Sequence, residues 1–175
     1  MNDARNVLDE FKGKSHEEIV VALDARGVSL EIAIENLERD YNMGTIVRSA
    51  NAFGVRHVHI IGRRQWNKRG AMMTDKYLHV TYHESVSDFV RAMKQAGKEL
   101  VAIENNVDSA PLGETKLLEN TVLMFGSEGS GISEELLSKA DKIAHIEQLG
   151  STRSLNVGVA AGIAMYEWSK QNGID

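Results

Sequence analysis

The chain has 175 residues, which is the length of one compact domain. Hydrophobic residues make up 42% and charged residues 26%, a composition that supports a sizeable core and argues against disorder. The absence of cysteine excludes a disulfide framework and thiolate metal sites. The net charge of −5 argues against a generic polyanion binder. No apolar run reaches the roughly 18 residues of a membrane span, and no secretory signal is visible, so we expect a cytoplasmic protein without membrane contact.

The first half of the chain contains patterns of both helix and strand. Ser15 and Glu18 have the spacing of a capping box, and Gly27 marks the end of the helix that they begin. Residues 29–36 alternate apolar and mostly polar side chains, which predicts a strand. Residues 42–53 are predicted to be a helix that Gly54 ends, and the next strand follows directly at 56–61.

The second half continues the alternation of the two element types. Short strands are predicted at 77–83, 98–105, 121–125 and 141–147, and helices are predicted to begin at Ser85, Ser133 and Ser154. Such alternation predicts an α/β fold with a mainly parallel sheet and helices on both faces. We expect residues 1–175 to be a single domain in which residues 1–28 are a helical N-terminal extension.

Residues 62–76 are locally basic although the chain is acidic overall. A charged segment of this kind is usually a solvated loop. The alternative is a surface that contacts RNA phosphates, with an aromatic side chain that stacks on a base. The candidate RNA-binding residues are Arg63, Arg64, Trp66, Lys68 and Arg69.

Residues 34–55 contain two polar residues in an otherwise apolar helical pattern. Asn42 stands at the predicted helix start, where it could cap the first turn. Arg48 lies six positions later among apolar residues, where a cation needs a partner or solvent. Arg48 is therefore either half of a structural ion pair or a functional cation.

Residues 125–137 have the order strand, glycine-rich turn, helix. Gly126, Gly129 and Gly131 permit positive φ angles and close approach of a ligand to the backbone. The spacing is not that of the dinucleotide fingerprint, and no P-loop lysine follows. Glu128 inside the turn would repel a pyrophosphate. The segment is thus a candidate ligand turn of another kind.

Residues 146–168 end in a helix of very small side chains. Ser154 could cap this helix, and Asn156 could form a local hydrogen bond in its first turn. Because glycine is a poor helix former, the small residues predict close approach of another backbone, either within the chain or in a partner. These small residues are Gly158, Ala160, Ala161, Gly162 and Ala164.

Together, these three segments make the sequence similar to the SpoU/TrmH branch of the SPOUT RNA methyltransferases. Asn42 with Arg48 resembles the first family motif, FGSEGSGI the second, and SLNVGVAAGI the third. The resemblance covers roughly residues 30–168. It implies a C-terminal trefoil knot, S-adenosyl-L-methionine as methyl donor, a homodimer, and methylation of a ribose 2′-hydroxyl in tRNA or rRNA without a metal.

The resemblance also assigns site residues by position. Because a guanidinium group does not accept a proton, we expect Arg48 to hold a substrate phosphate and stabilise the developing alkoxide, with the other polar residues as orienting groups. The matching catalytic positions are Asn42, Arg48, Glu128, Ser154 and Asn156. The matching cofactor positions are Gly126, Ile146 and Leu155, with Ala102, Ile103, Glu104, Gln148 and Gly150 nearby.

The chain departs from the family pattern at two places. The third motif usually opens Ile-Pro, but here Glu147 follows Ile146, and a later serine of the motif is Gly158. Loss of the proline removes a backbone constraint and suggests weaker donor affinity. The alternative function is a non-catalytic RNA- or nucleotide-binding module of the same fold, and the choice between tRNA and rRNA stays open.

Overall fold

The computed structural model describes residues 4–173 apart from 38–41, 107, 128 and 153. The fold is built on a seven-stranded sheet with the order β3-β2-β1-β6-β4-β7-β5, in which every ladder is parallel. The predicted α/β class is therefore confirmed. The strands are β1 (Val28–Asn36), β2 (Val55–Gly62), β3 (His79–His83), β4 (Glu99–Ile103), β5 (Ala110–Pro111), β6 (Thr121–Phe125) and β7 (Lys142–His145).

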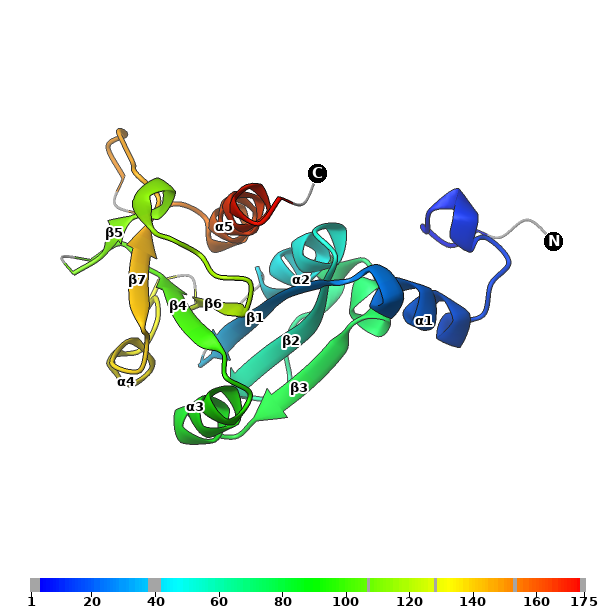
Figure 1. Ribbon diagram of the computed structural model, residues 1–175, viewed down its shortest axis with the longest axis horizontal. Helices are drawn as coiled ribbons and strands as arrows, with labels where there is room; N and C mark the ends of the chain where they lie inside the picture. Colours follow the sequence, from blue (N-terminus) through cyan, green and yellow to red (C-terminus); the bar gives the residue numbers. More distant parts are fainter. Residues whose placement is uncertain (1–3, 38–41, 107, 128, 153, 174–175) are drawn as a thin grey trace.

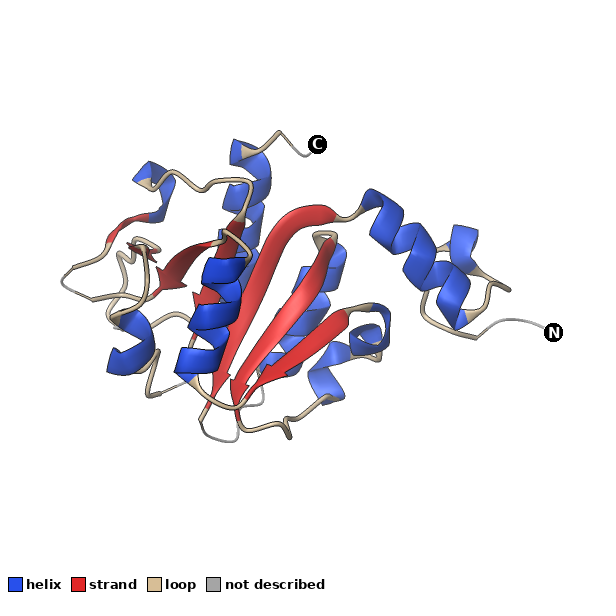
Figure 2. Ribbon diagram, turned by 60° about the horizontal axis from the view of Figure 1, so that its bottom comes forward, coloured by secondary structure: helices blue, strands red, loops and turns tan. Residues whose placement is uncertain are grey.

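Helices cover both faces of the sheet (Figures 1 and 2). The alternation of β1 sends Ile32 and Ile34 into a core with α2 and α5, and sends Ala33 into a second core with α3 and α4. In the described part of the chain, no helix is long and apolar enough to cross a membrane. The helices are α1 (His16–Arg26), α2 (Met43–Ala52), α3 (Val86–Gln95), α4 (Glu134–Leu137) and α5 (Val157–Gln171).

The N-terminal helix α1 projects beyond the end of the sheet (Figure 1). Its capping box forms as predicted, because the Ser15 hydroxyl accepts from the Glu18 backbone N–H and the Glu18 carboxylate accepts from the Ser15 backbone N–H. The buried guanidinium of Arg56 pairs with Asp24 at 2.7 Å and also donates to the Tyr77 carbonyl. These contacts attach α1 to the start of β2.

The expected start of the last helix at Ser154 was wrong, whereas α2 starts at Asn42 as expected. Helix α5 begins at Val157, and its N-cap is Asn156, whose Oδ1 accepts from the Val159 backbone N–H at 3.2 Å. Ser154 therefore does not cap it. Asn42 already has helical dihedral angles and forms no capping hydrogen bond. Its Oδ1 instead accepts from the Asn156 Nδ2 at 3.0 Å, so that the starts of α2 and α5 are joined.

The small residues of α5 pack closely, as expected. A Cβ on Gly158 would lie 2.9 Å from the Thr45 Cγ2 of α2, and Ala161 and Ala164 are fully buried. A Cβ on Gly162 would meet no atom within 4 Å. The close approach predicted for this helix is thus to α2 at Gly158, while Gly162 belongs to a side of α5 that this chain does not cover.

Candidate functional site

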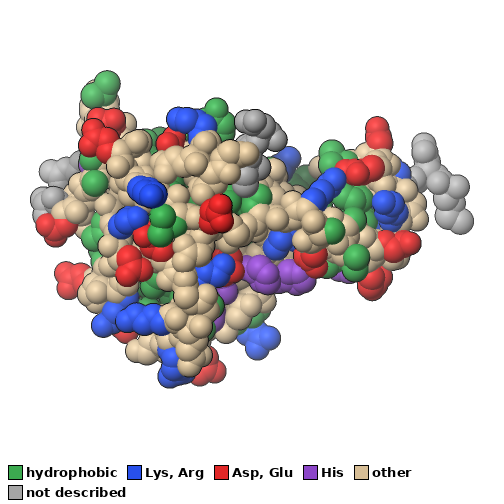
Figure 3. Space-filling model, viewed as in Figure 1, with side chains coloured by type: hydrophobic (Ala, Val, Ile, Leu, Met, Phe, Trp, Pro, Cys, Tyr) green, Lys and Arg blue, Asp and Glu red, His purple; other side chains and the backbone are tan. Residues whose placement is uncertain are grey.

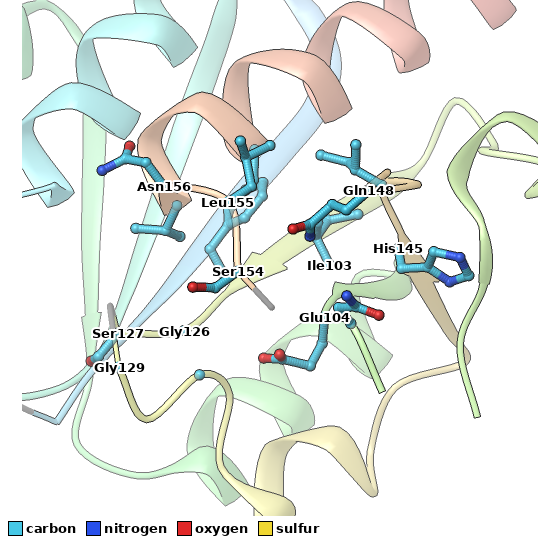
Figure 4. A pocket seen from close by; sticks show the side chains of 16 residues that line it. Ile103, Glu104, Gly126, Ser127, Gly129, His145, Gln148, Ser154, Leu155 and Asn156 are labelled. Carbon is cyan, nitrogen blue, oxygen red and sulfur yellow. The ribbon is translucent and has the colours of Figure 1, made fainter. Parts of the chain in front are cut away.

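A pocket of about 300 Å³ lies at the carboxyl edge of the sheet (Figure 4). Parallel strands place their carboxyl ends at one edge, where ligands of α/β proteins commonly bind. The walls come from the end of β4, the turn after β6, the segment after β7, and the start of α5. The pocket is within the size range of small-molecule sites.

The turn after β6 depends on its glycines. Ser127 and Gly131 exchange two backbone hydrogen bonds, at 3.1 and 2.9 Å. Gly129 and Gly131 have φ angles of +109° and +68°, as predicted for a glycine-rich turn. At Gly126 the constraint is space, since a Cβ there would lie 2.1 Å from the Gly131 carbonyl carbon. The turn therefore presents bare backbone to the pocket.

The walls of the pocket combine apolar and polar side chains. Ile103, Ile146, Leu155 and Val157 contribute apolar surface. None of the described residues that line the pocket is Lys or Arg, whereas Glu104 supplies a carboxyl group. A phosphate would meet no Lys or Arg among the described lining residues, whereas an aromatic ring with a cationic tail suits these mixed walls.

The carboxylate of Glu104 is turned towards the glycine-rich turn (Figure 4). Its Oε2 accepts from the Ile132 backbone N–H at 2.9 Å, and a Cβ on Gly131 would lie 2.6 Å from the same oxygen. Glu104 therefore fixes the turn as well as lining the pocket.

The structure brings most of the predicted site residues together. Two predicted cofactor positions do not line the pocket: Ala102 is buried inside the sheet, and Gly150 is exposed beyond the pocket wall. Glu128 lies outside the described residues. Those that do line the pocket are Ile103, Glu104, Gly126, Ile146, Gln148, Ser154, Leu155 and Asn156.

Arg48 is exposed on α2 and does not line the pocket. Within the described part of the chain it forms no ion pair or side-chain hydrogen bond, so the structural ion pair considered above is not found there. Asn42, at the start of the same helix, does not line the pocket either but accepts a hydrogen bond from Asn156, which does. Arg48 is thus on α2, and the pocket is walled in part by the start of the neighbouring helix α5.

The basic segment forms an exposed loop after β2. The guanidinium of Arg64 lies over the Tyr82 ring, and Lys68 pairs with Asp75 at 2.8 Å, while Arg63 and Arg69 are exposed. Trp66, in contrast, is half-buried, packs against the core, and has Lys68 over its ring at 5.4 Å. The Trp66 ring is therefore mainly a structural anchor, which argues against the predicted stacking on a base.

The same loop is packed on the helix that carries Arg48. A Cβ on Gly44, in the first turn of α2, would lie 2.6 Å from the Ala71 backbone nitrogen, and a Cβ on Gly70 would lie 3.0 Å from that of Thr45. The two backbones therefore touch. Charges of both signs are mixed on the face seen in Figure 3, and the chain as a whole has a net charge of −5.

Sequence reasoning missed Glu35 and Asn36, the last two residues of β1. Both side chains are 2% exposed although both are polar. The one signal in the sequence is a pair of polar residues at the end of an apolar strand.

The fold and pocket define an α/β protein with a small-molecule site at the carboxyl edge of a parallel sheet. A sequence model of the SpoU rRNA Methylase family matches residues 29–166. The chain therefore belongs to the SpoU methylase family.

Individual relatives agree with this assignment. The chain is 28% identical over 152 residues to the tRNA (guanosine(18)-2′-O)-methyltransferase of Escherichia coli, covering 85% of this chain and 66% of that protein. The Aquifex aeolicus TrmH/SpoU tRNA modifying enzyme superposes with a TM-score of 0.79 at 27% identity, covering 90% and 82%. The AdoMet complex of the SpoU methyltransferase AviRb from Streptomyces viridochromogenes gives 0.71 at 26% identity, covering 82% and 58%.

Proposed function

We propose that the protein transfers a methyl group from S-adenosyl-L-methionine to a ribose 2′-hydroxyl of tRNA or rRNA. The observation that carries the proposal is the pocket, in a chain that belongs to the SpoU methylase family. Its apolar side chains suit an adenine ring, and its bare glycine backbone admits close contact. The lack of Lys and Arg among the described lining residues suits a cationic sulfonium. The E. coli relative is named for the same ribose chemistry.

In this reaction the residues of the chain bind the donor, orient the substrate and stabilise developing charge. Bound S-adenosylmethionine supplies an electrophilic methyl group. Gly126 and Leu155 shape the pocket around it, and Asn156, held by Asn42, fixes the start of α5 beside it. Arg48 grips the substrate phosphate next to the reacting ribose and stabilises the developing alkoxide, and the proton leaves through phosphate or water. Ser154 and Glu128 act as further orienting groups.

Donor binding is the direct test of the pocket. We expect S-adenosylmethionine and S-adenosylhomocysteine to bind with low micromolar Kd, about −8 kcal/mol, because the pocket offers apolar surface and backbone contacts. NAD and ATP should not compete, since their phosphates would find no Lys or Arg among the described lining residues. Calorimetry that showed tight NAD binding and no heat with S-adenosylhomocysteine would contradict the proposal.

The exposed loop is proposed to contact RNA through its cations. Replacing Arg63, Arg64, Lys68 and Arg69 together by Ala should weaken binding of bulk tRNA at least tenfold at low salt and flatten the salt dependence, because fewer counterions are released. Fluorescence anisotropy over a KCl series measures both quantities. Donor affinity, measured by calorimetry, serves as the control. Unchanged RNA affinity and salt slope would show that the loop is only a solvated surface.

A homodimer is proposed because an apolar part of α5 and the side chain of Arg48 are exposed in the described part of the chain. Leu155, Val159, Ile163 and Tyr166 are between 37% and 59% exposed at helical spacing beside α2. If two copies pair through this surface, Arg48 of one protomer can serve the pocket of its partner, which its own position does not reach.

This surface gives a further prediction. Ile163→Asp should convert the dimer to monomer at micromolar concentration, since it places a charge in an apolar contact. Sedimentation velocity measures the change, and Lys170→Asp, on the exposed end of the same helix, is the matched control. A wild-type protein that is active as a clean monomer would contradict the pairing.

Three further features belong to the proposal. We infer a C-terminal trefoil knot, supported by the family resemblance and by the position of β7 between the earlier strands β4 and β5. We propose that residues 30–168 form the family core and residues 1–28 an extension of the same single domain. We also propose that the protein works in the cytoplasm, on tRNA or rRNA.

A further inference from the structure

The end of β1 lies between the two loops that the proposed function uses. β1 pairs with β2, which leads into the basic loop, and with β6, which leads into the glycine-rich turn. Successive side chains of a strand point to opposite faces. Glu35 therefore faces the side of α3 and α4, and Asn36 faces the side of α2 and α5. Both are almost completely buried.

Glu35 holds the exit of the glycine-rich turn. Its Oε2 accepts from the Ser133 backbone N–H at 2.7 Å, and its Oε1 accepts from the Ser133 hydroxyl at 2.6 Å. The backbone carbonyl of Glu35 also accepts from the Ser127 hydroxyl at 3.3 Å. One residue of β1 thus binds the turn at its beginning and at its end.

Asn36 holds the start of the basic loop in the same manner. Its Nδ2 donates to the carbonyl oxygens of Arg63 and, at 3.1 Å, Gln65. Its own carbonyl accepts from the Arg63 backbone N–H at 3.1 Å. A Cβ on Gly62 would lie 3.2 Å from this carbonyl oxygen, so the chain leaves β2 in close contact with Asn36.

Burying the polar side chain of Glu35 costs free energy, and this cost is offset if the buried group orders a loop that binds a ligand. A buried carboxylate loses hydration. Among the described residues, no Lys or Arg pairs with Glu35, and its carboxylate is compensated by the backbone N–H and the hydroxyl of Ser133. The loops that are held have little regular structure of their own. A loop that is not ordered beforehand must be ordered when the ligand binds, which lowers affinity.

We propose that Glu35 is a positioning residue for the methyl donor and that Asn36 is a positioning residue for RNA. Each acts through the loop that it holds and touches neither ligand. The part concerning Asn36 rests on the proposed role of the basic loop in RNA binding. Because the two side chains point to opposite faces, the two effects are separable although the residues are adjacent.

The donor half is tested with two replacements of Glu35. Glu35→Gln keeps the size but cannot accept from both Ser133 donors, and should raise the S-adenosylmethionine Kd about fivefold to tenfold. Glu35→Asp keeps the carboxylate but is one methylene too short, and should raise the S-adenosylmethionine Kd more than Glu35→Gln does. Calorimetry is done at a temperature where circular dichroism shows each variant folded. An Asp variant with wild-type affinity would overturn this half, because charge alone would then suffice.

The RNA half is tested with Asn36→Leu and Asn36→Asp, which keep the approximate shape and lose both donors. Anisotropy with labelled bulk tRNA should show a Kd raised about fivefold to tenfold for Leu and at least as much for Asp. The donor Kd of both should stay within twofold of wild type. If the fourfold Ala variant of the basic loop weakens RNA binding but Asn36→Leu does not, this half is overturned. If neither variant weakens RNA binding, then the basic loop does not bind RNA, and the proposed function of the loop is wrong.

Glu31→Gln is the matched control for mere destabilisation. Glu31 lies on the same face of β1 as Glu35 but away from both loops, where it bonds His59 at 2.7 Å and Lys98 at 2.6 Å. Its replacement should lower the melting temperature and leave both affinities within twofold. If Glu35 and Asn36 variants weaken donor and RNA binding equally, or if Glu31→Gln does so too, the effect is general loosening and the proposal is wrong.

Discussion

Arg48→Ala should lower the rate of RNA methylation by about a hundredfold or more and leave folding and donor binding nearly unchanged. The reason is that Arg48 is exposed and has no partner within the described part of the chain, so its removal leaves no buried charge behind. Loss of a single positioned group that stabilises developing charge typically costs about 10²–10³ in turnover. Single-turnover methylation with saturating donor measures the effect.

Arg48→Lys separates charge from geometry. Lys keeps the positive charge but loses the planar fork that grips a phosphate through two bonds, so little activity should return. Calorimetry of the donor and thermal unfolding are the controls for both variants. Normal methylation by Arg48→Ala would remove Arg48 from the reaction. If Arg48→Ala instead lowers the free energy of unfolding by about 3–5 kcal/mol, then Arg48 is half of a structural ion pair.

Gly126→Ala should abolish donor binding within measurable range, a loss of at least a hundredfold. A Cβ at this position would lie 2.1 Å from the Gly131 carbonyl carbon and 2.3 Å from the Ile132 nitrogen, and both are backbone atoms that no side-chain rotation can move. The turn must therefore open, and the backbone that walls the pocket moves with it. Calorimetry with S-adenosylhomocysteine measures the loss.

The matched control is Gly113→Ala, because a Cβ on Gly113 meets no atom within 4 Å and its φ angle is not positive. This variant should bind the donor like wild type. If Gly126→Ala binds equally well, then the glycine-rich turn does not form the donor site, and the assignment of the pocket is wrong.

The elements of this fold were predictable where local chemistry determines them. The alternation over residues 29–36 predicted a strand, and the two faces of β1 indeed enter two different cores. The capping box at Ser15 and the Ser85 cap predicted the starts of α1 and α3, since one hydroxyl satisfies a free N–H of the first turn in each case.

The predictions failed where two residues compete or where distant segments meet. Ser154 and Asn156 are both good N-caps, and the cap that forms is Asn156, which also donates to Asn42 at the start of α2. Likewise, Glu35 holds Ser133, which lies 98 positions away in the sequence. No local pattern reports such a contact. Trp66 could be either a stacking platform or a core residue until its packing was known.

The candidate site was predictable mainly through the family resemblance. Eight of the proposed positions line one pocket although they come from three separate segments. Spacing alone could not have joined them, because the topology of the sheet brings β4, β6 and β7 to one edge. The exclusion of a phosphate cradle, however, followed from Glu128 and the missing lysine in the sequence, and the described walls are likewise free of Lys and Arg.

The central claim is methyl transfer to a ribose in RNA, and one measurement tests it most directly. The purified protein is incubated with S-adenosylmethionine labelled in its methyl group and with total RNA, which is then digested to nucleosides and analysed by mass spectrometry. The account predicts label on the ribose of a 2′-O-methylnucleoside, and its loss with Arg48→Ala. Label on a base, or RNA that stays unlabelled although donor and RNA both bind, would contradict the account.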